Sequence, residues 1–214
     1  MGRKPVADST HHPSHRALGV VLRVQDHALE VLLDGDALPG AELERPEPLG
    51  AALARALDLG RLAHFEQLET RSDPDRAPSW QLATAYLGLV PTDAAIEGRW
   101  AVVDDLPPLV DDHAEIVLAA RARLRAKLSY TNVGFALAPE TFTISELRAI
   151  YVAALGHDVS ATNLQRVLVR RRVLERIPGR RAPGRTGGRP AALFRFAARE
   201  LEITDEFAAL GPPR

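Results

Sequence analysis

The stretch "TISELRAIYVAALGHDVSATNLQRVLVRRRVL", from Thr143 to Leu174, decides the fold of the C-terminal half of this chain. It opens with Thr143 and Glu146 at the spacing of a capping box. In this motif the side chain of each residue accepts a hydrogen bond from the backbone N–H of the other. Gly156 is typical of a helix end. A helix between these signals would bury one face at helical spacing, formed by Leu147, Ile150, Tyr151 and Ala154.

A second helix is predicted after a short turn, with Ser160 as its N-cap. Leu164, Val167 and Leu168 share one face of this helix. At 100° per residue the opposite face carries Thr162, Arg166 and Val169, with Gln165 and Arg170 on the flanks. Two short helices joined by a tight turn, the second with a basic open face, indicate a helix-turn-helix.

The segment that follows, "VLERIPGRRAPGRTGGRPAALFRF", predicts a wing: a short strand, a loop of Gly, Pro and Arg, and an aromatic strand. Arginine suits such a tip because its planar fork binds phosphate and fits a narrow minor groove. The glycines could suggest a phosphate loop, but the Lys-Ser/Thr ending of that motif is absent. The residues predicted to contact DNA are Thr162, Asn163, Gln165, Arg166 and Arg170 on the helix, and Arg180, Arg181, Arg185 and Arg189 on the wing.

The charge distribution supports a nucleic-acid partner, although the net charge of the 214 residues is only −1. Residues 160–199 hold eleven arginines against one acid, Glu175, a net of +10, so the rest of the chain carries −11. An acidic module joined to a basic binding surface explains this asymmetry. The chain has no cysteine and no apolar run long enough to cross a bilayer, so we expect a cytoplasmic protein without a membrane partner.

The N-terminal half reads as a sheet with one embedded helix, an α/β (α+β) pattern. "ALGVVLRV" and "ALEVLLD" are strand-like runs joined by a hairpin signal, and "LAHFEQLET", "WQLATAYLGLV" and "RWAVV" supply further strands. We predict a disordered tail over residues 1–15, a first domain over 16–110, and a connector helix with the winged domain over 111–214. The connector helix is expected to bury Ile116, Leu118, Ala119, Ala122 and Leu124.

Both halves together resemble the Nudix-related transcriptional regulators of the NrtR type, from about Leu18 to Phe196. The resemblance is carried by "YTNVGFAL" (130–137), by Thr143, Glu146, Leu147 and Tyr151 in the helix after it, by "GRPAALF" (188–194), and by the loop "EQLETRSDPDRAP" (66–78). It implies a Nudix-like domain followed by a winged helix-turn-helix, and a homodimer that binds a palindromic operator. It also implies a repressor of NAD or related nucleotide metabolism, with ADP-ribose or a related nucleotide as effector and no cofactor.

The stretch "PGAELERPEPLGAALARALDLG", from Pro39 to Gly60, resembles the catalytic Nudix box without its acids. In working enzymes, several glutamates of this box hold the divalent cations that activate water. Aligned on Glu47 and Arg55, the metal-binding positions fall on Ala56, Leu59 and Gly60. If the helix is instead two residues short, Asp58 is the one acid left. Under both alignments we expect no catalytic residue and no metal site, with Glu47 and Arg55 forming a structural pair.

The effector-binding residues are predicted from the loop that matches the family: Arg71, Asp73, Asp75, Arg76 and Trp80, with Phe65 as an alternative stacking partner and Glu69 nearby. Arginines would hold phosphate and an aromatic ring would stack on a base. The same residues could equally form salt bridges within the loop. Two alternatives stay open: a diphosphate hydrolase with a nucleic-acid-binding appendage, supported by Glu42, Glu44, Glu47 and Asp58, and an architectural protein without a ligand.

Overall fold

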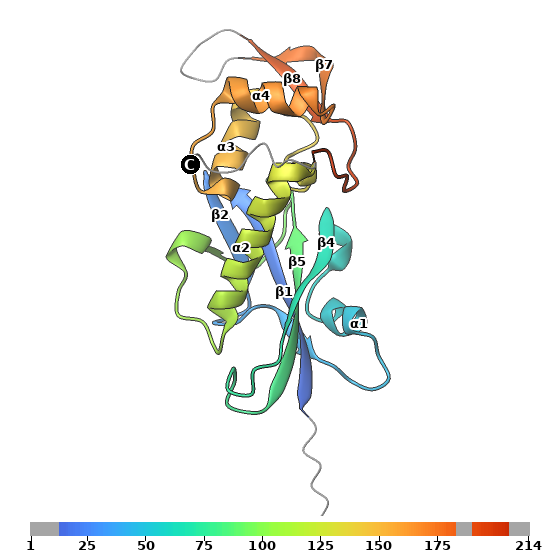
Figure 1. The fold of residues 1–214 in the computed structure, drawn as a ribbon, viewed down its shortest axis with the longest axis vertical. Coiled ribbons are helices and arrows are strands. Elements are labelled where there is room, and N and C mark those ends of the chain that lie inside the picture. Colours follow the sequence, from blue (N-terminus) through green and yellow to red (C-terminus); the bar gives the residue numbers. More distant parts are fainter. Residues whose placement is uncertain (1–12, 183–189, 206–214) are drawn as a thin grey trace, which may run out of the picture.

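The computed structural model describes residues 13–182 and 190–205. A mixed sheet with helices on both faces is followed by a small helical unit with a two-stranded wing (Figure 1). The strands are β1 (Ser14–Gln25), β2 (Ala28–Leu33), β3 (Gly40–Glu42), β4 (His64–Arg71), β5 (Gln81–Leu89), β6 (Arg99–Val102), β7 (Leu174–Arg181) and β8 (Ala191–Phe196). The α-helices are α1 (Leu49–Ala54), α2 (His113–Tyr130), α3 (Ile144–Leu155) and α4 (Ala161–Arg170), with 3₁₀ turns η1 (Leu59–Arg61), η2 (Val103–Asp105) and η3 (Val133–Ala136). This architecture confirms the predicted α+β class.

The first sheet has the order β4-β5-β1-β2-β6, and β3 pairs with β1. β1 runs parallel to β5, and the other pairs are antiparallel. The hairpin predicted between β1 and β2 is confirmed. Asp26 and His27 both have positive φ, which a two-residue turn of the right twist requires.

Alternate residues of β1 face the two sides of the sheet, as strand geometry dictates. Leu18 and Leu22 belong to the main core together with Leu124 of α2, whereas Ala17 packs with Leu53 of α1 on the other side. The long helix α2 therefore covers one face and the short helix α1 the other (Figure 1).

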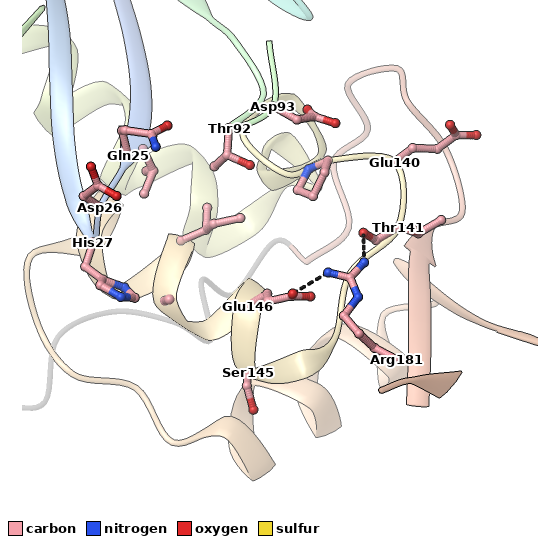
Figure 2. A pocket seen from close by; sticks show the side chains of 14 residues that line it. Gln25, Asp26, His27, Thr92, Asp93, Glu140, Thr141, Ser145, Glu146 and Arg181 are labelled. Atoms are coloured by element: carbon pink, nitrogen blue, oxygen red, sulfur yellow. Dashed lines mark hydrogen bonds and ion pairs between the residues drawn. The ribbon is translucent and has the colours of Figure 1, made fainter. Parts of the chain in front are cut away.

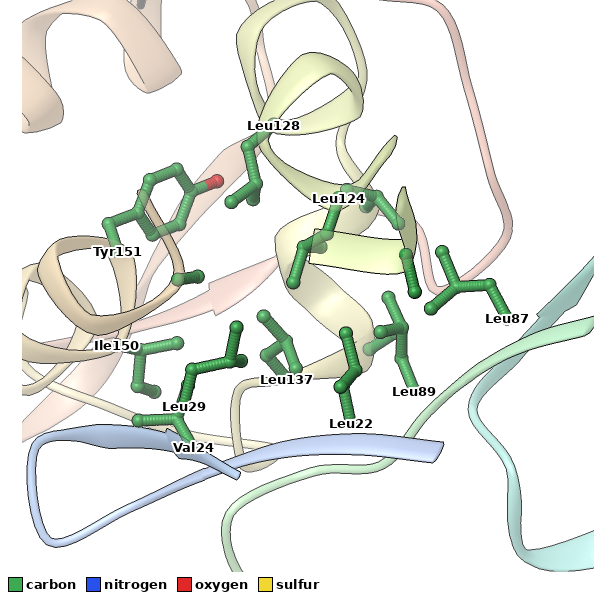
Figure 3. Close-up of a cluster of buried hydrophobic side chains, with 14 of the residues drawn as sticks. Leu22, Val24, Leu29, Leu87, Leu89, Leu124, Leu128, Leu137, Ile150 and Tyr151 are labelled. Atoms are coloured by element: carbon green, nitrogen blue, oxygen red, sulfur yellow. The ribbon is translucent and has the colours of Figure 1, made fainter. Parts of the chain in front are cut away.

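The main core runs without a break from the sheet through α2 into α3, α4 and β8. Figure 3 shows the part of it between the sheet and α3. Leu22, Leu89 and Leu124 are fully buried near one end, and Tyr151 of α3 is fully buried near the other. α2 thus packs against both halves, and a domain boundary at residues 110–111 stays a prediction.

The predicted apolar face of α2 was partly wrong. Ile116 and Leu124 are buried, but Leu118 is 43% exposed and Ala122 is exposed. The buried stripe follows a four-residue step instead: Ile116, Ala120, Leu124 and Leu128. Residues four apart lie on one face of a helix, whereas Leu118 lies about 200° around the helix from Ile116 and therefore points away from that face.

The helix-turn-helix signals are confirmed residue by residue. Thr143 and Glu146 form the complete capping box, and Gly156 ends α3 with φ of 72°. The Ser160 side chain accepts a hydrogen bond from the Asn163 N–H, and α4 buries Leu164, Val167 and Leu168. α4 ends at Arg170, four residues before the end of the quoted stretch, because Arg172 adopts a left-handed conformation (φ 58°).

The strand β1 begins at Ser14, inside the stretch expected to be a tail, while residues 1–12 lie outside the described range. Within the described residues, no helix is long and apolar enough to cross a membrane.

Candidate nucleic-acid interface and effector site

The outer face of α4 presents the five helix residues predicted to contact DNA. All five are exposed: Thr162, Asn163, Gln165, Arg166 and Arg170. The guanidinium of Arg166 donates to Asn163 Oδ1 at 2.8 Å, which holds both side chains on the same side of the helix. Arg and Asn are the side chains that make bidentate contacts with guanine and adenine edges in a major groove.

A groove of about 510 Å³ lies between α4 and the wing strands. Gln165 and Val169 line it from α4, Arg176 from β7 and Ala191 from β8. α4, the predicted recognition helix, and the wing strands thus lie on either side of this groove. This arrangement would let α4 contact the major groove of DNA while the wing contacts the neighbouring backbone.

The wing arginines differ in their surroundings. Arg180 is exposed on β7. Arg181 turns back towards α3, where it pairs with Glu146 and donates to the Thr141 carbonyl at 3.3 Å (Figure 2). Arg181 therefore connects the wing to the capping box of α3. Arg185 and Arg189 lie outside the described residues.

A cavity of about 870 Å³ opens beside this pair, at the junction of the sheet and the winged unit (Figure 2). The β1–β2 turn contributes Asp26 and His27, and the segment before α3 contributes Glu140. None of the five residues predicted for the effector lines this cavity.

The effector loop gathers its two arginines at the N-terminus of α2. Arg71 donates to Glu69 at 2.8 Å and lies 3.8 Å from Glu115. Arg76 is buried and forms a two-point ion pair with Asp112, at 2.5 and 3.1 Å. The Arg76 guanidinium is thus engaged in holding the loop to α2.

The other residues predicted for the effector lie on the surface of the loop. Asp73 and Asp75 are exposed, and Asp73 accepts a hydrogen bond from the Asp75 N–H at 2.9 Å. Trp80 is 51% exposed. Phe65 stacks on Tyr86 with ring centroids 5.1 Å apart, a contact within the protein. The role of these residues in effector binding stays a prediction.

His113, at the start of α2, is buried and accepts a hydrogen bond from the Leu38 N–H at its Nδ1, 2.9 Å away. Burial lowers the pKa of His113, although Asp111 and Asp112 act in the opposite direction. The neutral ring therefore links α2 to the loop after β2.

The Pro39–Gly60 stretch forms a loop and a helix of only six residues, Leu49–Ala54. Arg55, just after α1, pairs with Glu47 and donates to the Glu42 carbonyl at 2.6 Å, which agrees with the predicted structural pair. The hydrogen bonds from Arg55 and from the Glu44 backbone lower the pKa of the Glu47 carboxyl.

The helix ends before the positions where a Nudix box places its metal-binding acids. Asp58 instead accepts a hydrogen bond from the Gly60 N–H at 3.1 Å and lies 3.3 Å from Arg61. Within residues 13–182 and 190–205, no three acidic or histidine side chains form a group that could hold a metal ion.

Both halves of the chain are similar to known proteins. A family model described as the NrtR DNA-binding winged helix domain matches residues 134–196. NrtR of Shewanella oneidensis, crystallised with a 27-mer DNA, is 26% identical and superposes with a TM-score of 0.71 over 85% of this chain and 92% of that one. The chain is similar to the NrtR-type, Nudix-related regulators in both halves.

Two further proteins are similar to this chain. The ADPR responsive transcriptional repressor NtrR of Acinetobacter baylyi is 29% identical over 183 residues, which cover 78% of this chain and 72% of the relative. A MutT/nudix family protein from Enterococcus faecalis is 20% identical, with a TM-score of 0.66 over 88% and 90% of the two chains, and shows the shared fold.

One buried arginine was missed by the sequence analysis. Arg171 was counted with the basic residues, yet its side chain is only 3% exposed and pairs with Asp205 at 2.8 Å. The signal was present in the sequence. Arg171 lies three, four and seven residues after Leu168, Val167 and Leu164, so helical spacing places it on the buried face.

Proposed function

We propose that this chain is a sequence-specific DNA-binding transcriptional repressor that responds to ADP-ribose. The observation that carries the proposal is the exposed polar and basic face of α4, presented on a winged unit that matches the NrtR DNA-binding domain along its length. The Acinetobacter relative is named as an ADPR-responsive repressor, which supports the same effector for this chain.

The proposal includes a homodimer on a palindromic operator. Two recognition helices related by a two-fold axis would enter successive major grooves about 34 Å apart. By the resemblance to the family, the regulated genes are those of NAD or related nucleotide metabolism. Because a regulator works where the DNA is, we place the protein in the cytoplasm.

Binding to the DNA upstream of its own gene tests the first part of the proposal. We expect specific binding that weakens roughly a thousandfold between about 50 and 200 mM salt, because arginine contacts to phosphate release counterions. The measurement is fluorescence anisotropy with a labelled duplex and a scrambled duplex of the same length. Equal affinity for the two duplexes at all salt concentrations would contradict sequence-specific regulation.

We also propose that the Nudix-like domain binds ADP-ribose without hydrolysing it. Several carboxylates must act together to hold catalytic magnesium, and three of the four acids of this stretch, Glu44, Glu47 and Asp58, pair with Arg55 or Arg61.

With magnesium and ADP-ribose, we expect calorimetry to detect binding while chromatography detects no AMP above the rate without protein. An active Nudix hydrolase, assayed in parallel, serves as the positive control. Turnover comparable to that control would favour the alternative of a hydrolase with a DNA-binding appendage.

A further inference from the structure

The residues after the wing return to the centre of the molecule. This C-terminal strap, residues 197–205, leaves β8 with a hydrogen bond from the Ala197 N–H to the Val173 carbonyl at 2.9 Å. It ends against the last turn of α2, where the Thr204 N–H donates to the Tyr130 carbonyl at 2.8 Å. The strap therefore joins the wing to α2 through backbone contacts.

Asn132 fixes the strap from the side of α2. Its side chain is 1% exposed and makes two hydrogen bonds of 2.8 Å, to the Glu200 carbonyl and from the Glu202 N–H. The Asn132 N–H also donates to the Glu202 carbonyl at 3.2 Å. A buried amide that is satisfied on both sides specifies one register of the strap.

Arg171 fixes the strap from the side of the recognition helix. It is the C-cap residue of α4, and its guanidinium donates to Asp205 at 2.8 and 3.2 Å and to the Ser129 carbonyl at 2.6 Å. One buried side chain thus joins three segments: α4, the end of α2 and the strap. Its neighbours Arg170 and Arg172 are exposed.

We propose that Arg171, Asp205 and Asn132 are positioning residues for DNA binding, which brace the recognition helix and the wing against α2 so that both reach the duplex in one fixed geometry. This inference rests on the proposed DNA-binding function. Arg171 itself is buried away from any duplex, and its effect passes through the placement of α4.

If Asp205 acted only through its charge, its removal would be expected to strengthen DNA binding and not to weaken it. Removing an acid near a DNA-binding surface reduces repulsion of phosphate and should tighten binding. If Asp205 instead holds Arg171 in place, its loss leaves a buried guanidinium without its partner and loosens the end of α4. The sign of the change in affinity therefore separates the two roles.

The experiment compares Asp205→Asn and Arg171→Lys with the wild-type chain on the upstream duplex. We expect each variant to bind roughly tenfold more weakly or worse, with an unchanged slope of log affinity against log salt. A lost phosphate contact would lower that slope by about one unit. Glu175→Gln is the matched control, since Glu175 is an exposed acid on β7 that pairs with Arg195. It should bind as tightly as the wild type or slightly more tightly.

Circular dichroism melting identifies any variant that is unfolded at the assay temperature. If Asp205→Asn is unfolded, the test rests on Arg171→Lys, which keeps the positive charge. Wild-type affinity or tighter binding in the folded variants would overturn the proposal, as would a slope reduced by about one unit in Arg171→Lys. Failure of the wild-type chain to bind any duplex would overturn the proposed function and this inference together, and would be seen before any variant is measured.

Discussion

Replacing Arg166 by alanine is expected to weaken operator binding by about 1–3 kcal/mol, roughly 5- to 150-fold. Arg166 lies in the middle of the exposed face of α4, and its hydrogen bond to Asn163 orients its guanidinium across that face. A guanidinium held in this way is suited to the paired acceptors of a guanine in the major groove. Loss of that contact removes both affinity and the preference for one base pair.

Anisotropy titrations with single-base-pair variants of the operator measure this effect. In the wild type one position should show a strong preference, and in Arg166→Ala that position should become nearly indifferent. Arg61→Ala is the matched control because it removes the same charge from an exposed site near α1. Equal losses in the two variants would show that Arg166 acts only through its charge.

Replacing Gly134 by alanine is expected to destabilise the fold by about 1–3 kcal/mol, the range of a buried overpacking substitution. A Cβ at this position would lie 2.5 Å from the hydroxyl oxygen of Tyr151, whose side chain is fully buried in the core between α2 and α3 (Figure 3). The buried ring has no room to retreat, so the backbone of η3 would have to move. Urea unfolding, monitored by circular dichroism, measures the free energy of unfolding.

Tyr151→Phe provides the test of this mechanism. The Tyr151 hydroxyl has no hydrogen-bond partner among the described residues, so its removal alone should change stability little. In the Gly134→Ala background it should recover part of the loss, because it removes the atom nearest to the new methyl group. Gly50→Ala in α1 is the control, since nothing lies within 4 Å of its Cβ position. Additive effects of Gly134→Ala and Tyr151→Phe would contradict the proposed contact.

Elements with local signals were predictable from the sequence. The capping box at Thr143, the N-cap Ser160 and the end of α3 at Gly156 each depend on residues a few positions apart, and all three are confirmed. The face of α4 followed from helical spacing alone. The predicted face of α2 was partly wrong because it included Leu118, which does not share a helical face with Ile116 and Leu124.

Contacts between distant residues were not predictable in this way. Arg76 and Asp112 are 36 positions apart, and Arg181 and Glu146 are 35 apart. Nothing in composition or periodicity pairs such residues, so the sequence did not show that these two arginines hold elements together. The sequence alone does not distinguish an exposed arginine from one that forms an ion pair with an acid far away in the chain, because folding brings the two together.

The division of roles along the chain follows from these contacts. The Nudix-like half contains the Glu47–Arg55 pair, while α4 presents an exposed polar and basic face. α2 spans the distance between them, with the Arg76–Asp112 pair at its start and the strap contacts at its end. An effector that prefers one arrangement of these parts needs only a few kcal/mol to change DNA occupancy.

The most direct test of a DNA-binding repressor that responds to ADP-ribose is one titration. A labelled upstream duplex is saturated with the protein, and ADP-ribose is added while fluorescence anisotropy is followed, with AMP as a control nucleotide. We predict that ADP-ribose lowers the anisotropy to that of free DNA in a saturable way and that AMP does not. An anisotropy that stays constant throughout the ADP-ribose titration, with the protein shown by calorimetry to bind that nucleotide, would contradict the account.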